Sequence, residues 1–434
     1  MFKQIMKKRI NSLIGYAHRI LFNSEAGERT LTFAKNVSLS FSGGLIAFMI
    51  LFGASVVAAR VLGPAEYGKY AALFSVAQML SLFYVLELDV SVLYFLSKRH
   101  KDRRSITASI VMMFFVNIVV FTFFAVSIYK FIMPVSVSQI AFIGAILVAL
   151  IFAFKRITDA FLRVENLFKR QAVFKVMEAV MVVSVLSILL FVLKQREYFS
   201  YVSAIILGGT VFIILGAGTV RHMIAIRGVS TVCMNKVFEY NVFGLIGSAV
   251  NGVVKNMDKL IIIALLGASV SGVYAVYFTA SVIIGARVTQ LFINVFFPAA
   301  RADGVNVKKV FIKINKLCVR IVVPLAIVAS GGVALVVMLY GSQYQFVWSW
   351  VILSGIYIAV HFFASLYGWL LSSISKGGYK KYNVSFVYGF VIYWAFIWIV
   401  FLNNLFGITA LLCALVIYRV VGWTVAYFEL KKMV

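Results

Sequence analysis

The eleven residues "VLGPAEYGKYA" (Val61 to Ala71) return 204 positions later as "LLGASVSGVYA" (Leu265 to Ala275). The two copies share five identities: Leu62, Gly63, Gly68, Tyr70 and Ala71 match Leu266, Gly267, Gly272, Tyr274 and Ala275. We expect the first glycine of each copy to end a helix with a positive φ, and the second to let the next helix start close by. Two such turns, half a chain apart, indicate an internal repeat.

The rest of the chain reads as a helical membrane protein. Of its 434 residues, 63% are hydrophobic, and about 20 consecutive apolar residues are enough to cross a bilayer as a helix. The alternating pattern of a membrane β-barrel is missing, which leaves the all-α class. Twelve spans are predicted: 37–59, 70–96, 105–131, 139–154, 173–193, 201–221, 242–266, 272–300, 317–340, 346–374, 383–402 and 407–428.

Basic residues orient these spans. Lys and Arg gather in the N-terminal arm, in the connections after the even-numbered spans and in the tail, while the opposite side holds only Arg60, Lys69, Lys130, Lys194 and Arg196. The positive-inside rule therefore predicts that both termini are cytoplasmic. We attribute the net charge of +27 to this topology and to contact with anionic membrane lipids, and expect no nucleic-acid partner because no soluble domain is present.

Both copies of the repeated turn fall on the outer side, after the first and seventh spans. Since six spans per repeat is an even number, the two halves share one orientation and are related by a pseudo-two-fold axis along the membrane normal. The predicted organisation is a basic amphipathic or simply solvated segment (1–36), a first six-helix bundle (37–226), a cytoplasmic linker (227–241), and a second six-helix bundle with a short tail (242–434).

Charges inside a span are costly and mark functional sites by default. The seventh span carries Asn251, Lys255, Asp258 and Lys259 at helical spacing, and the eighth carries Arg287, Gln290 and Asn294. At 1.5 Å per residue, Lys255 lies roughly 16 Å and Arg287 roughly 22 Å from the outer end. Lys259 is shallower, and its side chain is expected to reach outward.

Two interpretations of these charges stay open at this stage. In one, the cations line a water-filled cavity and bind an anionic ligand, to which arginine offers a bidentate fork and lysine a mobile point charge. In the other, Asp258 neutralises Lys255 or Lys259, and the group only locks the bundle. Since three cations share one acid, the balance is positive in either case.

Three further residues are candidates by position. Arg60 stands at the outer mouth, where it either contacts the anionic ligand or marks the membrane interface. Glu87 and Asp89 either carry a coupling ion or pair with Lys98 or Arg99. Asp258 is a further candidate for carrying the coupling ion. The three cysteines and four histidines show no metal-ligand spacing, so no metal or other cofactor is predicted.

The two turns also resemble those of a known family. "ARVLGPAEYGKYA" (Ala59 to Ala71) and "NMDKLIIIALLGASVSGVYAVYFTA" (Asn256 to Ala280), followed by Pro298, are similar to segments of the polysaccharide (O-antigen type) flippases of the multidrug/oligosaccharidyl-lipid/polysaccharide exporter superfamily. One departure is "LELDVS" (Leu86 to Ser91), where related chains often carry glycine.

The resemblance implies a flippase, not an enzyme. It implies that the cations bind a pyrophosphate, that Arg60 helps to release it, and that aromatics are available to stack on sugar rings, such as Tyr274, Tyr277, Trp348 and Trp350. Such a protein moves an undecaprenyl-pyrophosphate-linked oligosaccharide from the cytoplasmic to the outer leaflet of the bacterial inner membrane by alternating access, beside a glycan polymerase and a chain-length regulator. One alternative is a cation-coupled multidrug exporter of the same superfamily, which would want carboxylates in its cavity. A membrane glycan polymerase is a third, although the outer connections here are short and show no nucleophile–base pair.

Overall fold

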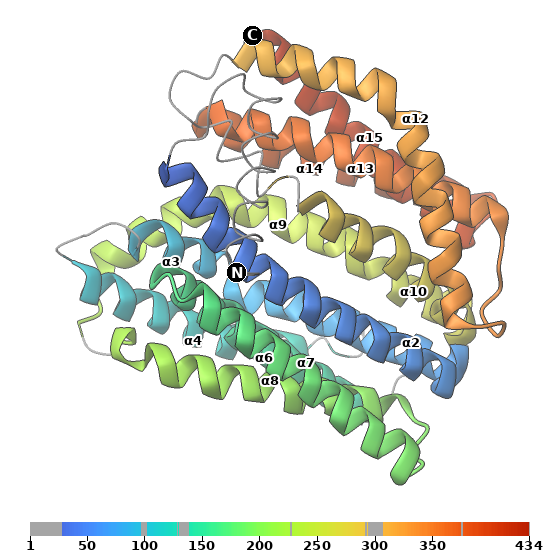
Figure 1. The fold of residues 1–434 in the computed structure, drawn as a ribbon, viewed down its shortest axis with the longest axis horizontal. Coiled ribbons are helices and arrows are strands. Elements are labelled where there is room, and N and C mark those ends of the chain that lie inside the picture. Colours follow the sequence, from blue (N-terminus) through green and yellow to red (C-terminus); the bar gives the residue numbers. More distant parts are fainter. Residues whose placement is uncertain are drawn as a thin grey trace, which may run out of the picture. The chain divides into compact units, whose positions relative to one another are not determined.

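The computed structural model describes residues 28–96, 102–127, 129, 139–225, 228–290, 293, 307–374 and 376–433, with side chains from residue 42 onward. These residues form helices and turns, and no strand occurs among them (Figure 1). The helices are α2 (Glu28–Val85), α3 (Leu88–Leu96), α4 (Arg103–Ser127), α6 (Gln139–Val164), α7 (Phe168–Ser187), α8 (Tyr198–Val220), α9 (Thr231–Leu265), α10 (Ala268–Phe278), α12 (Val307–Tyr340), α13 (Trp348–Ile374), α14 (Lys376–Leu402) and α15 (Ile408–Met433). Two π turns, Ile188–Val192 and Thr279–Ile283, extend α7 and α10.

The described helices account for the predicted spans. Ten of them are long and apolar enough to cross a membrane, and the pair within α9, bent by 51°, adds an eleventh. The longest of the ten, Ser42–Val85, is two helices that meet at Gly63, whose backbone is not helical. Divided there, it supplies the first two predicted spans, so the all-α, multi-pass fold class is confirmed.

One predicted boundary is wrong for an instructive reason. The fourth span was expected to end at residue 154, before "KRITD", but α6 runs on to Val164. Its charged residues are not in a loop because they have partners on neighbouring helices: Lys155 pairs with Glu178 of α7, and Arg156 pairs with Asp89 of α3 at 2.9 Å. Paired charges are tolerated inside a helix that a hydropathy count would terminate.

The described chain groups into two compact units. The first unit comprises Ser40–Val276 and Val337–Phe346, and includes the packed helices α6, α7 and α8. The second unit comprises residues 28–39, Tyr277–Val336 and Val347–Val434, and includes α13 and α14 packed on α15. The bundle boundaries expected from the sequence stay a prediction, and the segment expected to lie on the membrane face at 1–36 is largely outside the described residues.

Within the first unit, the repeated turns behave as their sequences predict. Gly63 has φ 77° and Gly267 has φ 88°, a region that disfavours residues with a side chain. Pro64 follows Gly63 directly and opens the next helix, a position where proline needs no backbone donor. The positive φ expected at both glycines is therefore confirmed.

The second glycine of each copy packs against the other copy. A Cβ on Gly68 would lie 1.9 Å from the Ala268 carbonyl oxygen, and a Cβ on Gly272 would lie 1.9 Å from the Pro64 carbonyl oxygen. Pro64 and Ala268 are themselves equivalent positions of the repeat. The contact is thus reciprocal, as a local pseudo-two-fold axis between the turns requires.

This contact generates a prediction about stability. Gly68→Ala forces a methyl group into a neighbouring backbone and is expected to destabilise the protein by about 1–3 kcal/mol, the usual cost of overpacking. Thermal unfolding of the detergent-purified protein measures the effect. Gly53→Ala is the matched control, because a Cβ at Gly53 in the same helix meets no atom within 4 Å. Equal melting temperatures for the two variants would contradict the close contact.

Candidate functional site

Asp258 and Lys259 form a closed cluster with Tyr274 where α9 lies beside α10. Asp258 is fully buried and Lys259 is 6% exposed. The Lys259 ammonium donates to Asp258 Oδ1 at 3.1 Å and to the Lys255 carbonyl at 2.7 Å, and the Tyr274 hydroxyl donates to Asp258 Oδ2. Asp258, the acid of the seventh span, therefore accepts hydrogen bonds from a lysine of its own helix, α9, and from a tyrosine of α10.

This geometry corrects one expectation. Lys259 does not extend to the outer surface, because its ammonium turns back along α9 into the bundle. When the two repeats are aligned at their offset of 204 residues, Ala54 and Ser55 are equivalent to Asp258 and Lys259. The first repeat thus builds the same position without charge, which favours a locking role for the pair in the second.

Lys255 and Asn251 lie on α9 one and two turns before this cluster. Both side chains are half-buried and belong to the first unit. The Lys255 carbonyl accepts a hydrogen bond from the Lys259 ammonium, and the Lys255 side chain is less buried than that of Lys259.

Arg287 and Gln290 lie in the second unit and are exposed. They follow the π turn Thr279–Ile283, which inserts about one extra residue into a turn and so rotates the helix beyond it. Arg287 and Gln290 therefore lie beyond the rotation that this turn introduces into the helix. Asn294 lies outside the described residues.

The tyrosines proposed as stacking platforms are core residues. Tyr274 and Tyr277 are fully buried. Tyr274 is held by Asp258, and the Tyr277 hydroxyl accepts the Val347 backbone N–H at 3.0 Å. Trp350 packs edge-on against Tyr277 and donates to Thr409. Neither tyrosine presents a face to a sugar in this structure.

Glu87 and Asp89 are paired, but not with the residues expected. Lys98 and Arg99 lie outside the described residues, and the partner is Arg156 of α6, 2.9 Å from Asp89 and 3.8 Å from Glu87. Glu87 sits at the break between α2 and α3, where φ is 42° at Leu86 and 62° at Glu87. This is the segment where the sequence departs from glycine, and two residues with side chains adopt a positive φ there at a cost in strain.

The other half-buried or buried acids of the first unit also have bases. Glu178 pairs with Lys155, and Asp159 lies 3.0 Å from Lys175 and 2.7 Å from Arg163. Positive and negative groups therefore offset one another among α3, α6 and α7.

Arg60 has a structural contact just before the break of α2 at Gly63. Its Nε donates to the Leu339 carbonyl at 2.7 Å, and Gln343 donates to the Arg60 carbonyl at 3.0 Å. Leu339 is in the last turn of α12, whose carbonyls have no partner inside the helix. A cation at a helix C-terminus is stabilising, so the side chain caps α12.

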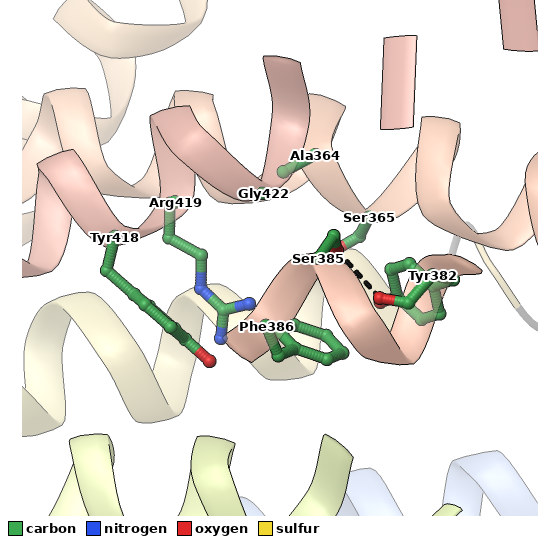
Figure 2. A pocket seen from close by; sticks show the side chains of 8 residues that line it. All are labelled: Ala364, Ser365, Tyr382, Ser385, Phe386, Tyr418, Arg419 and Gly422. Atoms are coloured by element: carbon green, nitrogen blue, oxygen red, sulfur yellow. Dashed lines mark hydrogen bonds between the residues drawn. The ribbon is translucent and has the colours of Figure 1, made fainter. Parts of the chain in front are cut away.

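Sequence reasoning missed Arg419. It interrupts the apolar run "LLCALVIYRVVGWTV" in the twelfth span, and the rule applied to Lys255 and Arg287 would have found it. Arg419 is 6% exposed, and its guanidinium lies 5.1 Å from the Tyr418 ring and 5.9 Å from the Phe386 ring (Figure 2). Three helices of the second unit, α13, α14 and α15, contribute to the small pocket beside it.

No cluster of metal-binding side chains occurs in the described part of the chain, and no curated protein sequence matches the chain. A family model described as "Polysaccharide biosynthesis protein" matches residues 33–301. The chain belongs to this family. The matched residues include Ser40–Val276, the main segment of the first unit, and both copies of the repeated turn.

Solved structures add the fold of this family member. It superposes on an outward-facing multidrug resistance MATE family transporter of the MOP superfamily with a TM-score of 0.57, at 13% identity over 96% of this chain and 97% of the other. A MATE protein in its bent conformation gives 0.60 at 12% identity, over 94% and 96%. A Vibrio cholerae MATE transporter gives 0.55 at 11% identity, over 93% and 98%. The family is thus a polysaccharide one, as the sequence resemblance implied, and the fold is the one that these transporters have.

The Asp258 cluster yields a prediction. Asp258→Ala leaves the Lys259 ammonium buried without its acid and is expected to destabilise the protein by about 3–5 kcal/mol. The double variant Asp258→Ala/Lys259→Ser copies Ala54 and Ser55 of the first repeat and is expected to recover most of that loss. Thermal unfolding of both variants decides the matter: a double variant no more stable than the single one would contradict the pairing.

Proposed function

We propose that this protein is a flippase that moves a polyprenyl-pyrophosphate-linked oligosaccharide, an O-antigen, capsule or exopolysaccharide repeat unit, from the cytoplasmic to the outer leaflet of the bacterial inner membrane. The family, which concerns polysaccharide biosynthesis, and the fold, which is that of membrane transporters, support transport rather than catalysis. Both termini then face the cytoplasm, as the distribution of basic residues predicts.

The observation that carries this proposal is the sign of the charge in the second half. After Lys259 the sequence contains only two acids, Asp303 and Glu429. Glu429 pairs with Lys381 and Lys432 at the end of α15, and Asp303 lies outside the described residues. Arg287 and Arg419 stand within spans of this half. An excess of cations favours an anionic cargo, and a pyrophosphate is such a group.

In the proposed mechanism, Lys255 and Arg287 attract the pyrophosphate. Arginine offers a planar fork for two phosphate oxygens, and lysine acts as a mobile point charge. The polar side chains Asn251, Gln290 and Asn294 are suited to sugar hydroxyls, while the polyprenyl tail stays in lipid. Asp258, which is tied to Lys259 and Tyr274, acts as part of the scaffold. Glu87 and Asp89, held by Arg156, are the candidates for coupling to an ion. A glycan polymerase and a chain-length regulator are the expected neighbours.

A cation-coupled drug exporter is the second candidate, because the solved structures with this fold include multidrug transporters. A cationic drug needs accessible carboxylates. Here Asp258 and Glu178 are buried against lysines, and Asp89 is held by Arg156. The charge arrangement therefore favours the anionic cargo.

The test is outward transfer of a pyrophosphate-linked polyprenyl oligosaccharide in proteoliposomes. Arg287→Ala is expected to reduce the transfer rate at least about tenfold, because a charged hydrogen bond contributes about 1.5–3 kcal/mol. Arg320→Ala, which removes an exposed arginine of α12, is the control and should transfer at the wild-type rate.

One result would overturn the flippase, and another would overturn only the role of Arg287. Proton-driven export of a cationic dye, with no transfer of any glycan lipid, would replace the flippase by the drug exporter. Equal transfer by wild type and Arg287→Ala would keep the flippase and remove Arg287 from phosphate recognition.

A further inference from the structure

The turn between α12 and α13 groups with the first unit, although the chain on both sides of it groups with the second. Residues Val337–Phe346 cluster with Ser40–Val276, whereas α12 up to Val336 and the chain from Val347 onward belong to the second unit. We call Val337–Phe346 the strap. It comprises the end of α12 and the turn that follows, where Gly341 bends the chain with a φ of 102°.

The strap binds α2 just before the break in that helix. Because Pro64 has no backbone N–H, the Arg60 carbonyl four residues earlier lacks its usual donor within the helix. Gln343 Nε2 donates to this carbonyl at 3.0 Å and to the Ala59 carbonyl at 3.1 Å. The Tyr344 hydroxyl also donates to the Ala59 carbonyl, at 2.9 Å. The strap thus supplies a donor that the break in α2 removes.

The hydrogen bonding is reciprocal, since α2 also caps the strap. Arg60 Nε donates to the Leu339 carbonyl in the last turn of α12 at 2.7 Å. The side chains of Arg60, Leu339 and Gln343 are exposed. Water can therefore replace these contacts when the strap leaves, without stranding a buried backbone group.

Two tyrosines of the strap are buried against the first unit. Tyr340 is fully buried, and Tyr344 is 2% exposed. Their ring centroids lie 6.0 and 6.2 Å from the ring of Tyr67, and the Tyr340 hydroxyl lies 3.0 Å from Ser55 Oγ. Burial of these rings makes the docked strap visible to any reagent that modifies exposed tyrosines.

Both ends of the strap are held in the second unit. Val336 precedes it within the continuous helix α12. Val347, directly after it, donates its N–H to the Tyr277 hydroxyl of the second unit at 3.0 Å. No slack residue lies between the strap and either anchor, so movement of the second unit relative to the first would pull the strap from α2.

We propose that the strap is a releasable lock, which is docked on α2 in the conformation described here and leaves α2 once in each transport cycle. The strap follows the ninth predicted span and meets the end of the first, which places it on the predicted outer side. The cycle itself rests on the proposed function, because alternating access is what moves one unit against the other. Docking and undocking of the strap can be measured without a cargo.

Hydroxyl-radical footprinting of the full chain in proteoliposomes measures undocking. Tyr84 is the internal reference, because it is also fully buried in the first unit, where its hydroxyl meets Thr122 of α4. We expect Tyr344 to be oxidised at least about tenfold faster than Tyr84, since local opening needs less free energy than unfolding of the core.

A substitution in the strap gives the matching change. Gln343→Ala removes two hydrogen bonds to α2 and is expected to raise the oxidation rate of Tyr344 at least about fivefold. Ser342→Ala alters an exposed residue of the same turn and should leave that rate unchanged.

A covalent link tests whether transport requires release. Tyr344→para-azidophenylalanine places an azide where the hydroxyl meets the Ala59 carbonyl, and illumination then joins the strap to α2, which peptide mass spectrometry verifies. We expect the crosslinked protein to lose transfer of the glycan lipid that it shows before illumination. The same replacement at Tyr388 of α14, which is 55% exposed, controls for illumination and should not change transfer.

The outcomes separate the strap from the flippase. Oxidation of Tyr344 as slow as that of Tyr84, in the wild type and in Gln343→Ala alike, would overturn the proposal. Equal transfer before and after crosslinking would keep the flippase and reject the strap as a lock. Oxidation of Tyr344 as expected, in a protein that transfers no glycan lipid, would keep the undocking of the strap and reject the flippase.

Discussion

The close approach of Gly68 and Gly272 fixes how the two copies of the repeated turn pack against each other. Each glycine admits a carbonyl from the opposite copy of the turn, Ala268 in one case and Pro64 in the other. Any side chain at either position would separate the turns by the width of at least a methyl group. The break of α2 at Gly63, the end of α9 at Gly267 and the start of α10 at Ala268 all lie within a few residues of this contact. The geometry of three helices therefore depends on four glycines that have no side chains to pack.

The charges divide into two kinds, and the division has a physical basis. In the first unit, Asp89, Asp159, Glu178 and Asp258 each have a base within bonding distance. These pairs offset the cost of burial and fix helices to one another. The second half has only two acids after Lys259, Asp303 and Glu429, and Glu429 pairs with Lys381 and Lys432. This excess of basic over acidic residues is the charge pattern on which the proposal of an anionic cargo rests.

Much of the fold could be predicted from residues 61–71 and 265–275 and from the hydropathy of the rest. The positive φ of Gly63 and Gly267 could be predicted from local stereochemistry alone. The site was harder. Lys259 was expected to reach outward from its depth alone, but depth does not say that an acid and a tyrosine lie on its inner side. Arg156 was counted with loop residues because an unpaired arginine would have ended the span, and its partner Asp89 lies 67 residues earlier in the chain.

The sequence by itself determined the properties that depend on composition and local geometry: the all-helical membrane class, the repeat, the backbone at its glycines and the family. Only the tertiary structure decided which charges neutralise one another and which remain beside a cavity. An ion pair depends on the separation of two side chains across different helices, and a hydropathy profile contains no such distance. Arg419 shows the difference well, since its sequence gives a charge in a span, and only the packing of α13, α14 and α15 gives that charge a pocket.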